Sequence, residues 1–159
     1  MTSLKIQPAP VRKTLSVKAS PERAFEVFTA GFDRWWPRSH HIGGVDMARA
    51  VLEPRAGGRW YEVSVDGAEC DWGEVLVWDP PQRLILAWRI GADWKYDPSL
   101  RTEVELRFTR EAGGGTRVDF EHRLLENMGE AGAAVREAID SPGGWSGILA
   151  MFAATADAA

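Results

Sequence analysis

The 159-residue chain is poor in the residue types that build several common kinds of site. It has a single cysteine, Cys70, which excludes an internal disulfide and is typical of a reducing compartment. No apolar run reaches the roughly 20 residues that a membrane-spanning helix needs, and the N-terminus carries no signal-peptide pattern. Phosphate loops, dinucleotide fingerprints and Ser-His-Asp spacings are also missing. We therefore expect a cytoplasmic protein with no cofactor and no catalytic constellation.

The chain also has little excess charge and no block of basic residues. Its formal net charge is −4 and its pI is near 5.4. Nucleic-acid-binding proteins need a basic face, so this composition argues against a nucleic-acid partner. The scattered Lys and Arg residues predict a solvated surface of mixed sign.

Tryptophan is the residue that the chain has in unusual number, with eight Trp against six Phe and two Tyr. An indole combines a large apolar body with one N–H donor, which suits cores, pocket walls and interfaces. A chain of this length can bury a sizeable core as one domain. We expect one domain over residues 11–156, after a flexible stretch over residues 1–10.

Alternating apolar residues between turn signals predict strands along most of the chain. The expected strands are residues 11–18, 48–53, 59–65, 70–78, 83–90, 102–110 and 116–124. Their apolar residues lie on one face, which is typical of an antiparallel sheet whose other face is solvated.

Helix signals occur after the first strand and at the end of the chain. Ser20 and Pro21 form an N-terminal cap for a helix that Gly31 ends. Residues 32–36 predict a second short helix, and residues 130–139 a later one. The last helix carries apolar residues at i, i+3, i+4 and i+7, namely Trp145, Ile148, Leu149 and Phe152.

Three segments carry a family resemblance: VLEPRAGGRW at 51–60, the run 73–88 with DPPQRL at 79–84, and Gly144-Trp145. With the order of elements, they resemble the START-like (birch-pollen-allergen-like, SRPBCC) superfamily from about Val11 to Phe152. The branch is similar to the C-terminal domain of activators of the ninety-kilodalton heat-shock chaperone ATPase. The resemblance implies an α+β helix-grip fold. In it, a curved antiparallel sheet of about seven strands wraps a long C-terminal helix, and two short helices follow strand one.

Three functions of different classes are open for such a chain. The first is non-enzymatic binding of a small hydrophobic or aromatic molecule between the sheet and the last helix. The second, implied by the resemblance, is interaction with a heat-shock chaperone in a stress response. The named activators also carry a separate N-terminal chaperone-binding domain, which this sequence does not contain. The third is a cyclase-like or hydrolase-like enzyme, in which His122 would act with Asp71 or Glu69. A monomer or a homodimer is expected in each case.

Aromatic residues at inward positions are the candidate ligand contacts. The expected cavity lining is Trp35, Trp36, Trp60, Trp88, Trp94, Tyr96, Phe108, Phe120, His122, Trp145, Leu149 and Phe152. The alternative is a filled core, because protein interiors pack densely. Trp94 and Tyr96 lie in a long loop, 91–100, which either covers the cavity as a lid or packs against the sheet.

The histidines and carboxylates give weaker indications of a functional site than the aromatic residues do. His40, His41 and His122 match no zinc motif, so we expect no metal site. On an inward strand position, His122 can bond either a ligand or a core carbonyl. Carboxylates on neighbouring strands are expected to face solvent: Glu62, Glu69, Asp71 and Glu74.

Overall fold

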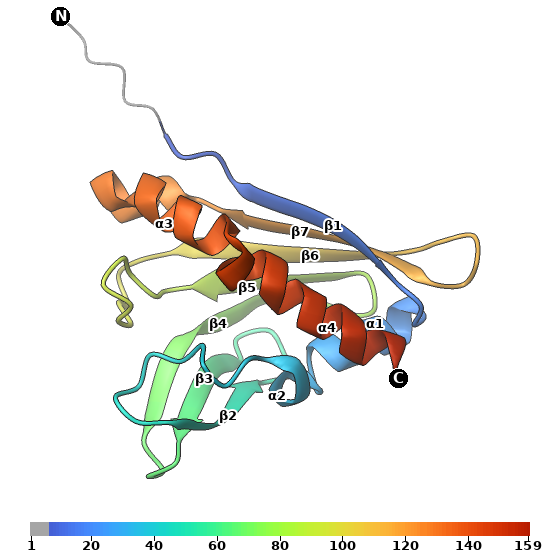
Figure 1. Ribbon diagram of the computed structural model, residues 1–159, viewed down its shortest axis with the longest axis horizontal. Helices are drawn as coiled ribbons and strands as arrows, with labels where there is room; N and C mark the ends of the chain where they lie inside the picture. The colour runs from blue at the N-terminus through green and yellow to red at the C-terminus, as the bar shows by residue number, and fades with distance from the viewer. Residues whose placement is uncertain (1–6) are drawn as a thin grey trace, which may run out of the picture.

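The computed structural model describes residues 7–159 (Figure 1). In this part of the chain, seven strands form one antiparallel sheet in the order β1-β7-β6-β5-β4-β3-β2. They are β1 (Val11–Val17), β2 (Met47–Leu52), β3 (Arg59–Ser64), β4 (Glu69–Asp79), β5 (Arg83–Trp88), β6 (Thr102–Arg110) and β7 (Thr116–Arg123). Residues 1–6 of the expected flexible stretch lie outside the described residues.

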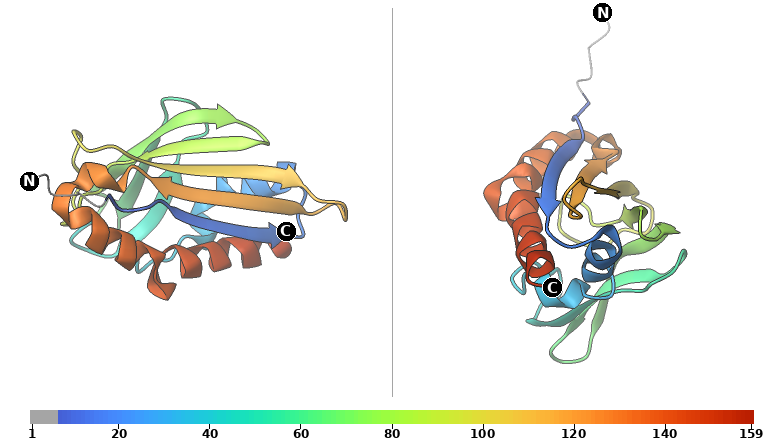
Figure 2. Two further views of the ribbon diagram at one scale, coloured as in Figure 1. Left: turned by 90° about the horizontal axis from the view of Figure 1, so that it is seen from above. Right: turned by 90° about the vertical axis from the view of Figure 1, so that its right-hand side faces the viewer.

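Helical segments lie along the concave side of the curved sheet (Figure 2). They are α1 (Pro21–Phe28), α2 (Phe32–Trp35), η1 (Leu125–Ala131), α3 (Gly132–Asp140), η2 (Pro142–Ser146) and α4 (Gly147–Asp157). The consecutive segments α3, η2 and α4 are called the helical arm below. The predicted α+β helix-grip fold is confirmed. In the described part of the chain, no helix is long and apolar enough to cross a membrane.

The start of α1 follows its sequence signal, but its end does not. The hydroxyl of Ser20 accepts a hydrogen bond from the backbone N–H of Arg23 at 3.2 Å, which is the predicted cap. The helix ends at Phe28 rather than at Gly31, and its C-terminal capping residue is Thr29, whose hydroxyl donates to the Phe25 carbonyl at 2.7 Å.

The alternation in β6 and β7 predicted their buried face correctly. Val104, Leu106 and Phe108 are buried. The opposite face carries ion pairs, in which Arg123 contacts Glu103 at 2.9 Å and also pairs with Glu105. Burial works to raise the pKa of Glu105, but hydrogen bonds from Arg123 and from a neighbouring arginine outweigh it and lower the pKa. The outer face is therefore charged and internally paired.

The C-terminal helix is broken where the sequence predicted a single start. A turn at η2 separates α3 from α4, and Trp145 lies in this turn rather than in a regular helix. Gly144 is non-helical, with φ −100° and ψ −135°. A Cβ atom at Gly144 would lie 2.3 Å from the carbonyl oxygen of Ile139, so only glycine fits the close approach of the two helices.

Trp145 joins the helical arm to the sheet through a chain of hydrogen bonds. Its indole N–H donates to Nδ1 of His122 at 3.1 Å. The other ring nitrogen, Nε2, lies 2.8 Å from the Thr102 hydroxyl, which donates to the Trp88 carbonyl at 3.0 Å. Because the hydroxyl proton is used at Trp88, His122 is neutral and carries its proton on Nε2. Burial lowers the pKa of His122 from 6.5 to about 3.

Replacing Gly144 with alanine should destabilise the protein by about 1–3 kcal/mol, because the added methyl group overlaps the Ile139 carbonyl. Gly143→Ala is the matched control, since its nearest neighbour would be the Ser141 side chain at 4.0 Å. Urea unfolding of both variants measures the difference. Equal stabilities of the two variants would show that the arm does not need glycine at its break.

His122 should make the protein less stable as the pH falls below about 6.5, because the unfolded state takes up a proton that the folded state rejects. The free energy of unfolding should drop by about 2 kcal/mol from pH 7 to pH 5 through this residue alone. A His122→Gln variant should start from a lower stability and lose about 2 kcal/mol less over that range. Parallel pH profiles of the two proteins, measured by urea unfolding, would contradict this expectation.

Candidate functional site

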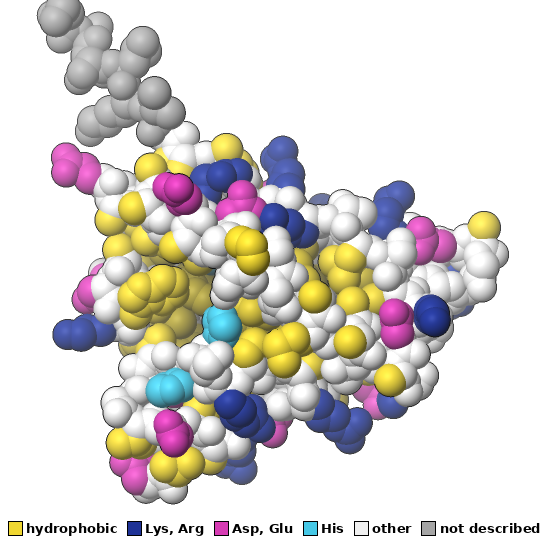
Figure 3. All heavy atoms as spheres, in the orientation of Figure 1, with side chains coloured by type: hydrophobic (Ala, Val, Ile, Leu, Met, Phe, Trp, Pro, Cys, Tyr) yellow, Lys and Arg dark blue, Asp and Glu magenta, His cyan; other side chains and the backbone are white. Residues whose placement is uncertain are grey.

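A cavity of about 370 Å³ opens between the helical arm and one end of the sheet. In Figure 3, apolar side chains gather in a hollow of this face, with histidine side chains at its border. The lining residues come from the sheet, two loops and the arm: Trp36, Ser39, His40, His41, Ile42, Trp72, Trp88, Ile90, Trp94, Ala138, Ile139, Ser141, Gly143, Gly144, Trp145 and Ile148.

Four indoles form the inner wall of the cavity. Trp36 lies 5.2 Å from Trp72 and 5.9 Å from Trp145, measured between ring centroids, and Trp88 lies 5.7 Å from Trp145. Each N–H is already bonded inside the protein: Trp36 to the His40 carbonyl, Trp72 to a carboxylate, Trp88 to a backbone carbonyl and Trp145 to an imidazole. The surface that these rings offer to a ligand is therefore carbon.

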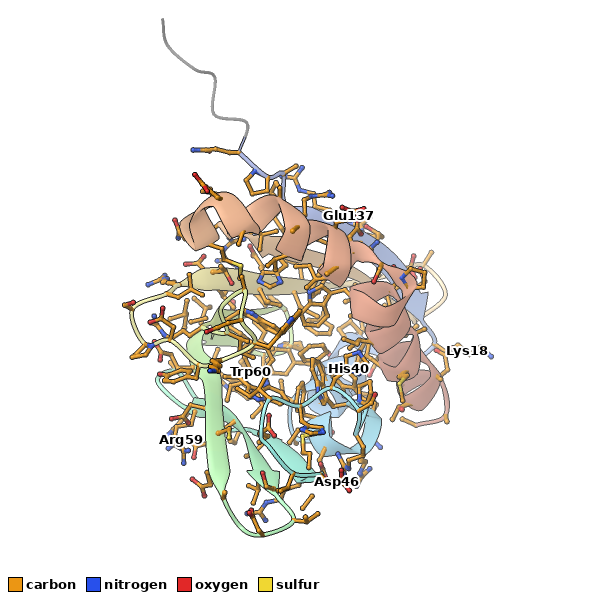
Figure 4. All side chains as sticks on the ribbon, turned by 60° about the vertical axis from the view of Figure 1, so that its left-hand side comes forward. Lys18, His40, Asp46, Arg59, Trp60 and Glu137 are labelled. Carbon is orange, nitrogen blue, oxygen red and sulfur yellow. The ribbon has the colours of Figure 1, made fainter. Side chains whose placement is uncertain are left out.

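The loop 39–46 forms the polar side of the cavity (Figure 4). His40 reaches from this loop to the helical arm, where its Nε2 lies 2.8 Å from the Gly143 carbonyl. Its Nδ1 lies 3.1 Å from the Ser39 hydroxyl. His41, the next residue, also lines the cavity.

Glu62 on β3 holds this loop in place, and its position corrects a sequence-based expectation. We expected Glu62 to face solvent, but its side chain is completely buried. It accepts hydrogen bonds from the backbone N–H groups of Ile42 at 2.6 Å and Gly43 at 3.2 Å, and from the Trp72 indole at 2.8 Å. A buried carboxylate needs such donors, so the loop and the sheet are joined here.

The other three carboxylates pair with arginines. Arg59 contacts Glu69 at 3.0 Å and Asp71 at 2.8 Å, and Arg89 contacts Glu74 at 2.6 Å. All three carboxylates are partly or fully exposed. The structure therefore does not bring Asp71 or Glu69 into hydrogen-bond contact with His122, whose two nitrogens are taken by Thr102 and Trp145.

The loop after β5 places its two aromatic residues on different sides. Trp94 lines the cavity with 48% of its surface exposed and has a left-handed backbone, with φ 60°. Tyr96 instead borders a separate depression on the sheet, beside Arg59 and Asp71. Of the predicted pair, Trp94 is therefore the residue at the cavity mouth.

Apart from Tyr96, the predicted lining residues divide into two groups. Four of them border the cavity: Trp36, Trp88, Trp94 and Trp145. Seven others lie in the packed interior, away from the cavity surface: Trp35, Trp60, Phe108, Phe120, His122, Leu149 and Phe152. Aromatic side chains fill this part of the interior. The rings of Trp35 and Phe152, for example, lie 5.4 Å apart between their centroids.

Sequence reasoning missed most of the polar and small lining residues. Ser39 was not among the predicted site residues, and His40 and His41 were considered only as metal ligands. Trp72 could not be placed on a face of its strand, because a bulge shifts the register between β3 and β4. Glu62 had a usable signal: it lies two residues after Trp60, and both share the inward face of β3.

Cys70 has no activated thiol. Burial is the main cause that raises the pKa of the Cys70 thiol, and the charge of Glu62 raises it further. Within residues 7–159, no group of three or more His, Cys, Asp or Glu side chains could hold a metal ion. The chemistry of this site therefore lies in the indoles and in the polar loop.

Comparisons with known proteins place the chain in a family. The model of the family described as "Activator of Hsp90 ATPase homolog 1-like protein" (AHSA1) matches residues 18–157. No curated protein matches the chain.

Among the solved structures that resemble this chain are two that are more than 30% identical to it. One is named an anthrahydroquino-γ-pyrone synthase, Txn09, complexed with SUM. It has 41% identity and a TM-score of 0.65 over 93% of this chain and 96% of that one. The other is a self-sacrificing resistance protein, CalC from Micromonospora echinospora. It has 33% identity and a TM-score of 0.70 over 95% of each chain.

An Aha1 dimer from Colwellia psychrerythraea shares the fold, with 16% identity, a TM-score of 0.61 and coverage of 94% and 96%. These matches confirm the predicted START-like superfamily and its activator-like branch. The chain belongs to the AHSA1 family, the Activator of Hsp90 ATPase homolog 1-like proteins.

Proposed function

We propose that this protein binds a planar, oxygenated aromatic molecule in the cavity between the sheet and the helical arm. The observation that carries the proposal is the wall of four indoles, Trp36, Trp72, Trp88 and Trp145, around a volume of about 370 Å³. This volume is within the range of about 300–1,000 Å³ that is usual for small-molecule pockets. Aromatic rings attract one another beyond their apolar area, so these walls favour a flat ring system.

The mouth of the cavity supports the same ligand class. Trp94 is exposed at 48%, although an indole gains free energy from burial. A ring system held between Trp94 and the inner indoles would cover this surface. The backbone of Trp94 is in the left-handed region, which costs free energy for a residue with a side chain.

The name of one relative supports oxygenated rings in particular. The relative at 41% identity is named a synthase of an anthrahydroquino-γ-pyrone, a name that describes fused rings with ring oxygens. The relative at 33% identity is named a resistance protein. By analogy, the polar loop with Ser39, His40 and His41 would face the oxygens of such a ligand, while the indoles contact its carbon faces.

An enzymatic function is the second candidate, and the 41% identical synthase is the observation that favours it. It would not use His122 with Asp71 or Glu69. Thr102 and Trp145 occupy both nitrogens of His122, and Asp71 pairs with Arg59. Any acid or base would have to come from the polar loop.

A heat-shock chaperone partner stays a prediction. Its support is the description of the family, whereas the cavity is a feature of this chain's own residues. Ligand binding is therefore the function that we place first.

Anthraquinone added to the purified protein should quench tryptophan fluorescence in a saturable way, because the ring would lie against several indoles. Trp94→Ala should weaken this binding by about three- to tenfold, which corresponds to the loss of one aromatic pair. Tyr96→Ala is the matched control, since Tyr96 lies in the same loop but borders a different depression. Its dissociation constant should equal that of the unchanged protein.

Two results would contradict the proposal. If fluorescence stays unchanged up to the solubility limit of anthraquinone, planar aromatic molecules are excluded as ligands. Equal weakening by the Trp94 and Tyr96 variants would place the ligand on the loop surface and outside the cavity.

A further inference from the structure

His41 lies in the wall of the cavity, in the polar loop that would face the ligand oxygens. Its Nδ1 lies 3.1 Å from the carbonyl oxygen of Gly43 and 4.0 Å from Oε2 of Glu62. Both neighbours are hydrogen-bond acceptors in the arrangement described above, since Glu62 receives three N–H donors. Nδ1 therefore carries the proton and donates it towards Gly43.

The other ring nitrogen of His41, Nε2, is left without a proton. In a neutral imidazole with the proton on Nδ1, Nε2 holds a free lone pair. Within residues 7–159, no group makes a hydrogen bond to this atom. The side chain is 23% exposed and borders the cavity, so a bound molecule can reach it.

The other two histidines of the chain differ in this respect. His40 has partners at both nitrogens, the Ser39 hydroxyl and the Gly143 carbonyl. His122 also has two, the Trp145 indole and the Thr102 hydroxyl. Among the three histidines, all of which lie in the described part of the chain, His41 alone offers an unused basic atom to the cavity.

Glu62 is the buried carboxylate next to His41. Its side chain has no exposed surface, and its hydrogen bonds fix it to the backbone of the segment that carries His41. If His41 gained a proton, the resulting positive charge would lie about 4 Å from the carboxylate of Glu62, and the two opposite charges would attract. Glu62 is thus placed to orient the imidazole and to balance its charge.

We propose that His41 acts as a base towards a ring hydroxyl of the bound aromatic molecule, with Glu62 as its positioning residue. This inference rests on the proposed function and narrows the ligand class to phenols and hydroxylated polycyclic rings. In the step, the O–H bond of the ligand breaks and a bond from hydrogen to Nε2 forms. The electron pair stays on the ligand oxygen, so a phenolate faces an imidazolium that Glu62 balances.

The test uses 2-hydroxyanthraquinone, whose neutral and anionic forms absorb visible light at different wavelengths. Bound to the unchanged protein near pH 6.5, the probe should show a ratio of anion to neutral form at least about tenfold higher than in buffer. At saturating probe, His41→Asn should hold the bound molecule in the neutral form. The asparagine amide can still donate to the Gly43 carbonyl, whereas the atom equivalent to Nε2 is gone.

Two further variants separate the base from the scaffold. Glu62→Gln should lower the anion ratio without replacing the base, and urea unfolding shows whether that variant is folded. If it is not, the His41→Asn comparison decides alone. Asp46→Asn, an exposed change in the same loop, should behave like the unchanged protein.

The outcomes distinguish the two proposals. A probe that binds but stays neutral in the unchanged protein would overturn the role of His41 and leave the binding function intact. An anion that persists in His41→Asn would overturn it as well. If neither anthraquinone nor its hydroxylated form binds, the proposed function fails, and the role of His41 fails with it.

Discussion

The hydrogen bond from Trp145 to His122 is the contact on which the shape of the interior depends. It fixes the turn of the helical arm against β7, and the Thr102 hydroxyl extends the connection to β6 and to the backbone of β5. With the turn held there, α4 packs its apolar face into the closed half of the sheet, where Phe152 contacts Phe28 and Trp35. The arm changes direction at Gly144, so α3 lies farther along the sheet and borders the open half. One interior thus contains both a filled core and a cavity.

Local patterns predicted much of this arrangement. The strict alternation of β6 and β7 gave their inward faces, and the spacing of Trp145, Ile148 and Phe152 gave the apolar side of the last helix. These signals depend only on neighbours along the chain. The fold class followed from their order together with the family resemblance.

Local sequence patterns could not predict which inward residues fill the core and which border the cavity. Phe120 and Trp88 both have inward positions, yet Phe120 is covered by Trp145 at 4.6 Å while Trp88 borders open space. That difference depends on where the arm bends, which is a contact between segments far apart in the sequence. A bulge in β4 had a similar effect, because it hid the facing of Trp72.

The cavity is assembled mostly from pieces outside the regular strands. The 39–46 segment, the loop after β5 and the turn of the arm supply many of its walls, while the sheet contributes chiefly Trp72 and Trp88. Replacements at Trp94, Ser39 or Ala138 leave the strand pairing and the dense aromatic cluster untouched. The shape and polarity of the cavity can therefore diverge among related sequences while the scaffold keeps its stability, and the same separation makes those three positions the natural starting points for redesign.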